Sequence, residues 1–150
     1  MSHAANQENF TASMTDAAST IADYFKGKIG FIPVLAKISL ACDCAGTSAP
    51  APKIHDIGIL ASIDPVAIDK AGLNLIKQNV DIGTEDLLNQ INRLKGENTI
   101  NVADKIGVGT VEYNLINLCS GDSEDIDKIG NSGSIVDITN LFILFILFLL

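Results

Sequence analysis

The chain is poor in cysteine and in clustered positive charge, and both shortages exclude classes of protein. Three cysteines in 150 residues are too few, and odd in number, for the disulfide framework of a small secreted protein. The N-terminus lacks the basic start and long apolar run of a secretory signal, so we expect a reduced, cytoplasmic setting. Ten Lys and Arg residues against 18 Asp and Glu give a net charge of -8 without any basic cluster. Because such a surface repels phosphate, we expect no nucleic-acid partner.

The composition is that of one globular domain followed by two unusual segments. With 47% hydrophobic residues, 150 residues can bury a single core. Small and acidic residues dominate after residue 118, so we expect an α/β domain over 1–118 and a flexible acidic linker over 119–134. Residues 135–150 form an apolar tail that ends in LFILFILFLL.

The apolar tail is too short to cross a membrane alone. Its last ten residues would make a helix of roughly 15 Å, about half the hydrocarbon thickness of a bilayer. A longer segment from Ile135 would include Asp137 and Asn140, and the tail has no polar face for lying on a membrane surface. We expect an altered or truncated terminus, with membrane contact or docking on the domain as the alternatives.

The first predicted element is an amphipathic helix over residues 10–26. Gly27 follows its end, and Thr11 lies near its start. Apolar residues recur at steps of three and four, which predicts a stripe that covers the core. The stripe consists of Phe10, Met14, Ala17, Ile21 and Tyr24 or Phe25.

Strands and helices then alternate along the chain. Because Pro33 has no backbone N–H for a ladder, the first strand is predicted from Val34 to Leu40. Residues 57–63 predict a second strand, buried on both faces. Asp64 before Pro65 is the signature of a helix N-cap, and this helix is predicted to reach Gln78.

Three further elements complete the predicted fold. Helices are expected over 84–94, with Gly96 as the stop, and over 99–106, ending at Gly107. Alternating apolar and polar residues predict a half-buried strand over 111–118. The alternation indicates an α/β architecture, a small mixed or parallel sheet flanked by helices.

Cys42 and Cys44 are the first candidates for chemistry. In extended backbone their side chains would project to the same side, where two thiolates could reach one soft metal or cluster iron. A tetrahedral site needs about four ligands, and the other obvious candidates are Cys119, His55 and Asp56. The alternative is that both cysteines are buried as small hydrophobic residues.

Asp69 is the second candidate, because its helix places it among apolar residues. On a helical wheel it falls between Leu73 and Ile76, inside the arc that should face the core. Unpaired burial of a carboxylate is costly, so Asp69 needs backbone N–H groups, a cation or a metal as its partner. We interpret Asp64 as an N-cap rather than a catalytic group.

The motif around these residues resembles a known family. The segment CDC followed by DIGILASIDPVAIDKAGLNLI resembles the C-terminal part of the uncharacterised iron-sulfur centre proteins, which carry the domain of unknown function 362. The resemblance runs from Phe10 to Tyr113, where GVGTVEYNL resembles the family's closing segment. It implies a preceding α/β portion and a ferredoxin-like insert with two CxxCxxCxxxCP runs for [4Fe-4S] clusters. Neither is present here, so the resemblance implies an incomplete portion of a larger α/β domain.

Without a CxxC motif, this chain alone is not expected to bind the iron-sulfur cluster of the intact family. Our first hypothesis is a metal or redox site with no defined reaction, completed by a missing upstream segment or a partner chain. The alternatives are a non-catalytic α/β interaction module and a tail-anchored, membrane-associated protein. The motif positions that match the family are Cys42, Asp43, Cys44, Asp56, Asp64 and Asp69, and the predicted metal ligands among them are Cys42, Cys44, Asp56 and Asp69.

Overall fold

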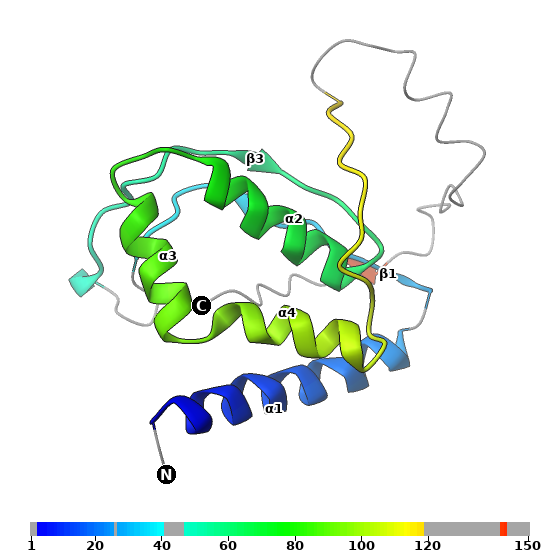
Figure 1. The fold of residues 1–150 in the computed structure, drawn as a ribbon. Helices are drawn as coiled ribbons and strands as arrows, with labels where there is room; N and C mark the ends of the chain where they lie inside the picture. The colour runs from blue at the N-terminus through cyan, green and yellow to red at the C-terminus, as the bar shows by residue number, and fades with distance from the viewer. Residues whose placement is uncertain (1–2, 26, 41–46, 119–141, 144–150) are drawn as a thin grey trace.

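The computed structural model of the chain describes residues 3–25, 27–40, 47–118 and 142–143 (Figure 1). These parts form a small mixed α/β fold, as the sequence predicted. The helices are α1 (His3–Tyr24), α2 (Pro65–Gln78), α3 (Thr84–Arg93) and α4 (Gly96–Lys105), and the strands are β1 (Ile29–Gly30), β2 (Val34–Leu35), β3 (Gly58–Ile59) and β4 (Phe142–Ile143).

The strands pair in two short ladders of opposite type. β2 and β3 are antiparallel, with Val34 opposite Ile59. Phe31 and Ser62 extend this ribbon, since each backbone N–H donates to the other residue's carbonyl at 2.8 and 3.0 Å. β1 pairs in parallel with β4, which places Ile29 opposite Phe142. A segment near the C-terminus therefore lies beside the start of the β region.

The first two of the three predicted strands are shorter than expected. The first was predicted to reach Leu40, but Lys37 adopts a left-handed conformation with a φ of 53°, which ends extended structure after β2. The second was predicted to be buried on both faces, and this is wrong, because Gly58, Ile59 and Ile63 are exposed. Within the described parts of the chain, β3 has one neighbouring strand.

The predicted helices after Pro65 are confirmed, but Gly96, predicted to stop α3, is instead the first residue of α4. α4 begins at Gly96 rather than at residue 99, because Lys95 takes the left-handed conformation, with a φ of 56°, that reverses the chain after α3. The strand predicted over 111–118 is wrong. This segment is irregular; its start lies against α2, where the Asn74 side-chain amide donates to the Tyr113 hydroxyl at 2.8 Å, and residues 114–118 are exposed.

The core consists of two clusters on either side of α2. The larger one joins α2, α3 and α4, and the smaller one packs Ile68 of α2 against Ile29 and Phe31. Figure 1 shows α4 between α2 and α1, so α4 has one face toward the core and another toward α1. The larger cluster consists of Ile54, Val66, Leu73, Ile76, Leu87, Ile91, Ile100 and Ala103.

α1 is turned differently from the prediction. Thr11 and Thr15 form its buried face, and Thr15 is 2% exposed, whereas Phe10 is 59% and Tyr24 83% exposed. The expectation that the apolar stripe covers the core is therefore wrong for Phe10, Ile21 and Tyr24, whereas Phe25, just after α1, does pack against the smaller core cluster. The physical reason is that α4 offers polar partners: the Asn98 side chain donates to the Thr11 hydroxyl at 2.9 Å, and Thr15 donates to the Thr99 carbonyl at 3.3 Å.

The linker predicted over 119–134 and most of the tail over 135–150 lie outside the described residues. In the parts of the chain that are described, no helix combines the length and the apolar character needed to cross a membrane.

Candidate functional site

The start of α2 fixes the orientation of the candidate residues. The Asp64 carboxylate accepts hydrogen bonds through Oδ1 from the backbone N–H groups of Val66 at 2.8 Å and Ala67 at 3.0 Å, and Pro65 occupies the first turn. The predicted N-cap is confirmed. The cap sets where the helix begins, and the 3.6-residue period then places Val66, Leu73 and Ile76 on the core side of α2.

Asp69 lies on the core side of α2, as the helical wheel predicts. It is half-buried, and its neighbours on the wheel, Leu73 and Ile76, belong to the larger core cluster. Burial raises the pKa of Asp69 from 3.8 to about 7. Within the described residues, its carboxylate has no hydrogen bond or ion pair. The partner expected for this buried acid is therefore absent from the parts of the chain that the structure describes.

Asp64 has a second structural contact. Its Oδ2 accepts from the Thr110 backbone N–H at 3.0 Å, and a Cβ at Gly109 would collide with the carboxylate. Gly107, with a φ of 77°, ends α4 as predicted. Nearby, the Asp104 side chain accepts from the Val111 N–H at 3.2 Å. Both carboxylate oxygens of Asp64 thus accept hydrogen bonds from backbone N–H groups. The bond to Oδ2 connects the turn after α4 to the start of α2.

Asp56 is exposed and also bonds to backbone. Its Oδ1 accepts from the N–H of Lys37 at 2.8 Å, where β2 ends. The cysteines Cys42, Cys44 and Cys119 lie outside the described residues, as does Asp43. The predicted convergence of the thiolates with Asp56 and Asp69 therefore stays a prediction.

His55 pairs with an acid that sequence reasoning missed. Its Nδ1 lies 2.6 Å from Oδ2 of Asp81, and its backbone N–H donates to the same oxygen at 2.8 Å. The sequence drew attention to Asp56 as the neighbour of His55 instead. No sequence signal indicated Asp81, which belongs to the turn between α2 and α3. Among the described residues, no three His, Cys, Asp or Glu side chains are grouped so that they could hold a metal ion.

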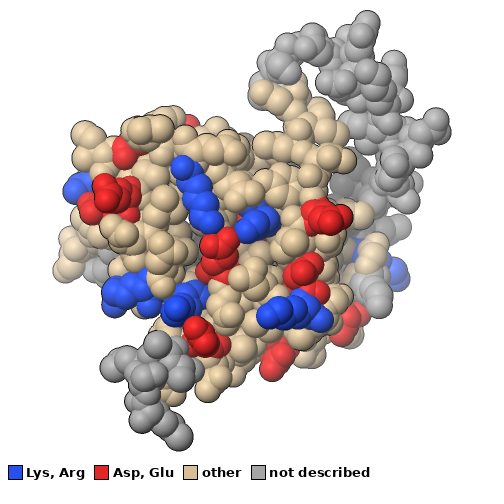
Figure 2. Space-filling model, in the orientation of Figure 1, with Lys and Arg blue, Asp and Glu red and all other residues tan. Residues whose placement is uncertain are grey.

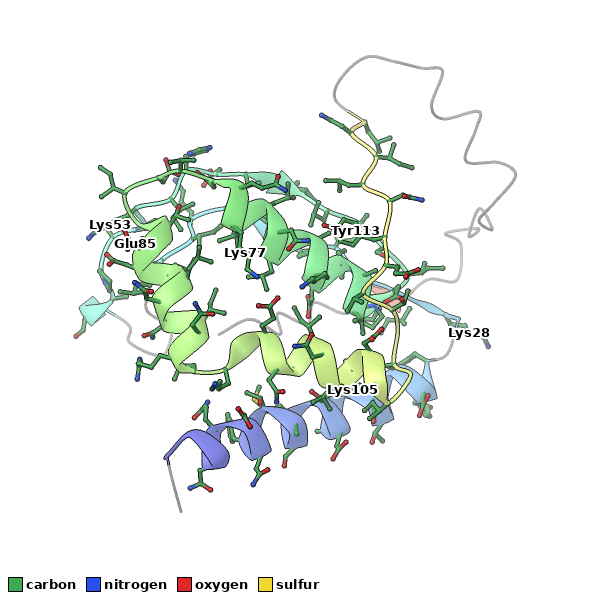
Figure 3. All side chains as sticks on the ribbon, in the orientation of Figure 1. Lys28, Lys53, Lys77, Glu85, Lys105 and Tyr113 are labelled. Carbon is green, nitrogen blue, oxygen red and sulfur yellow. The ribbon has the colours of Figure 1, made fainter. Side chains whose placement is uncertain are left out.

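Two lysines of α2 bind one acid of α4. Glu97 lies 2.8 Å from the Nζ of Lys70 and 3.0 Å from that of Lys77, and Figure 3 shows Lys77 pointing from α2 toward α4. Hydrogen bonds from Lys70 and Lys77 lower the pKa of Glu97. Acidic and basic side chains alternate on this face (Figure 2). This cluster joins two helices through one carboxylate that both lysines share.

A small apolar pocket lies beside the start of α3. Its volume is about 60 Å³, well below the several hundred Å³ of an ordinary small-molecule site. Asp56, Asp64 and Asp69 do not line it. The nearby Thr84 hydroxyl is buried without a hydrogen-bond partner in the described structure. The lining residues are Ile38, Leu40, Pro50, Ala51, Lys53, Ile54, Gly83, Asp86 and Leu87.

Comparison with known proteins gives one family. Residues 1–74 match the family described as Domain of unknown function (DUF362). The matched region extends from the N-terminus into α2 and contains Asp56, Asp64 and Asp69, so it supports the family resemblance that the motif indicated. No curated protein and no solved structure matches the chain.

Proposed function

We propose that the chain is a metal- or redox-associated α/β segment in which Asp69 supplies a carboxylate ligand. The environment of Asp69 supports this proposal most strongly. Its side chain lies on the core side of α2 and has no partner in the described structure, and burial raises its pKa. A cation would offset the cost of ionising a buried carboxylate. Cys42 and Cys44 are the proposed thiolate ligands, and Asp56 is the alternative carboxylate.

The donor set fits a single metal ion better than a cluster. Three cysteines without a CxxC motif are fewer than the four thiolates of an ordinary [4Fe-4S] site, so the family's cluster does not fit this chain alone. Two thiolates and one carboxylate are three of the four ligands that zinc or cobalt(II) takes. A water molecule, another segment or a partner chain would supply the fourth.

Cobalt(II) titration tests this proposal, because thiolate ligation gives an absorption band that other ligands do not. We expect the wild-type chain to show this band, and Cys42→Ser with Cys44→Ser to remove it. Asp69→Asn should weaken binding by about tenfold or more, in line with the loss of one ligand. Asp86→Asn, which changes an exposed acid of α3, is the matched control. A wild-type chain without the band, or cysteine variants that keep it, would contradict the proposal.

A second candidate function is that of a non-catalytic interaction module that packs on a partner. The specific observation in its favour is the exposed apolar stripe of α1, because large apolar side chains in a continuous row mark contact surfaces. Under this alternative, the motif aspartates serve caps and backbone contacts, as Asp64 and Asp56 do here. Removing Cys42 and Cys44 would then leave metal content unchanged.

A further inference from the structure

The backbone around β1 has a different neighbour on each side. The Phe31 N–H donates to the Ser62 carbonyl at 2.8 Å, and the Ser62 N–H donates back to the Phe31 carbonyl at 3.0 Å. Because the backbone groups of successive residues in a strand point to opposite edges, those of Gly30 face away from Ser62. β4 pairs with β1 in parallel, with Ile143 opposite Gly30 (Figure 1). We call the side of β1 that is turned away from Ser62 the acceptor edge.

The strand that carries the acceptor edge is buried. Ile29 and Phe31 are 6% and 7% exposed, and both pack with Ile68 of α2 in the smaller core cluster. Backbone N–H and carbonyl groups beside a core either bond to another strand or cost free energy when they lack a partner. The acceptor edge therefore requires one more strand, and β4 lies in that position.

The sequence that contains β4 has the composition of such a strand. Residues 141–150, LFILFILFLL, include no proline, glycine or charged residue. Phe and Ile favour strands, and a continuous apolar run without alternation is typical of parallel strands that are buried on both faces. The pairing of β4 with β1 is parallel, which agrees with this pattern.

The order of the elements permits this pairing within one chain. Parallel strands cannot be joined by a tight turn and need a long crossover connection, which usually contains helix. Between β1 and β4 the chain passes through α2, α3 and α4. One molecule can therefore supply both the acceptor edge and the strand that fills it.

We propose that the acceptor edge binds the apolar C-terminal run of the same chain, so that this run serves as a strand of the domain rather than as a membrane segment. A helix of ten residues would span about half of the hydrocarbon core of a bilayer. A strand beside β1 instead bonds its backbone to the domain. This inference goes beyond the proposed function and does not depend on the metal site.

NMR spectroscopy of the full wild-type chain tests this proposal. We expect nuclear Overhauser contacts between Gly30 and Ile143 and slow hydrogen exchange of the Gly30 N–H. An isotope-labelled chain mixed with an unlabelled one separates contacts within a chain from contacts between two copies. The contacts should all lie within one chain.

A charged variant of β4 gives a second measurement. Phe142→Asp with Ile143→Asp places two carboxylates against a buried strand, which is unfavourable. The exchange of the Gly30 N–H should become at least about tenfold faster. The Phe31 N–H is the internal control, because it bonds to Ser62 on the other side, and its exchange should change by less than about twofold.

Two controls separate this effect from others. Val80→Asp with Ile82→Asp makes the same chemical change at apolar side chains that are 97% and 90% exposed, and should leave both exchange rates unchanged. Phosphatidylcholine vesicles are the probe for a membrane segment. We expect the wild-type chain to remain unbound when such vesicles are floated.

Four results would overturn the proposal. They are a wild-type chain without the contact between Gly30 and Ile143, a contact found only between two copies, flotation of the wild-type chain with the vesicles, and an unchanged Gly30 exchange rate in the β4 variant. If the β4 variant unfolds, the contacts of the wild-type chain decide alone. Cobalt(II) binding is not part of this test, so its failure is distinguishable from failure of the metal proposal.

Discussion

α4 is held on its two sides by different physical means. Toward α2 and α3 it buries Ile100 and Ala103 in an apolar cluster around Leu73, which is 0% exposed. Toward α1 it offers the Asn98 side chain and the Thr99 carbonyl to two threonines. Buried apolar side chains contribute roughly 1.5 to 3 kcal/mol each, whereas a neutral hydrogen bond contributes about 1 kcal/mol. The core side should therefore be the stronger, and α1 the part that separates first.

Leu73→Ala should have the largest effect, because it empties the centre of the core side. We expect the free energy of unfolding to fall by about 3 kcal/mol, measured by urea denaturation. A loss below about 1 kcal/mol would contradict the view that the α2–α3–α4 cluster is the main source of stability. Ile82→Ala, at an exposed position, should change stability by less than about 0.5 kcal/mol.

Asp69→Asn also changes the core side, but it should raise the free energy of unfolding rather than lower it. The pKa of Asp69 is about 7 in the folded chain and near 3.8 when unfolded, so folding takes up a proton between these values. This carboxyl therefore lowers stability as pH rises from about 4 to 7. The shift corresponds to at most about 4 kcal/mol, and partial exposure reduces it to roughly 2 kcal/mol.

Urea denaturation with a chelator present measures this effect. We expect Asp69→Asn to be more stable than the wild type at pH 8 and equal to it near pH 4, apart from the small cost of the amide. Equal stability at pH 8 would mean that a segment outside the described residues pairs with the carboxylate. Added zinc should reverse the order at pH 8 if Asp69 is a ligand.

Asp64→Ala should destabilise the core side less than Leu73→Ala. It removes the cap of α2 and the acceptor for the Thr110 N–H, so we expect a loss of about 1 to 2 kcal/mol in urea denaturation. Asp86→Ala, in the first turn of α3, should cost less than about 0.5 kcal/mol. Equal effects of the two substitutions would show that neither the cap of α2 nor the Thr110 contact adds measurable stability.

Thr15→Val tests the α1 side. It keeps the shape of a buried side chain but removes the hydroxyl that donates to the Thr99 carbonyl, so we expect a loss of about 1 kcal/mol. Hydrogen exchange should speed up in α1 and stay unchanged in α2 and α3. If all helices change together, the two sides of α4 are one cooperative unit.

Glu97→Gln should have the smallest effect. It leaves Lys70 and Lys77 without their acid, but the group is partly exposed, so the expected loss is below about 1 kcal/mol and should shrink in high salt. Because the pKa of Glu97 is lowered, its contribution is present above pH 4.5 and is lost as pH falls through the folded pKa. Urea denaturation at pH 7 and pH 3 measures this difference.

Local signals predicted the helical part of the fold. Asp64 with Pro65 marked the start of α2, and the helical period then placed Asp69 on its core side. These predictions hold because capping and period depend on residues within a few positions of one another. The antiparallel pairing of β2 with β3 and the irregular path of residues 111–118 depend on distant partners that alternation alone does not reveal.

The rotation of α1 was missed for the same reason. A heptad row of apolar residues shows that some surface will cover it, but not which one. The threonine face became the inner face because α4 supplies hydrogen-bond partners there. The pairing of His55 with Asp81 was missed for a similar reason. The two residues are 26 positions apart, and no spacing rule connects residues at that separation.

The bond from the Thr110 N–H to Asp64 turns the segment between these residues into a closed ring. Its first helix begins at Oδ1 of this carboxylate, and the turn after its last helix is bonded to Oδ2, so one side chain links the two ends. A single acid thus ties the start of α2 to the turn after α4, so its removal should loosen both ends of the three-helix segment.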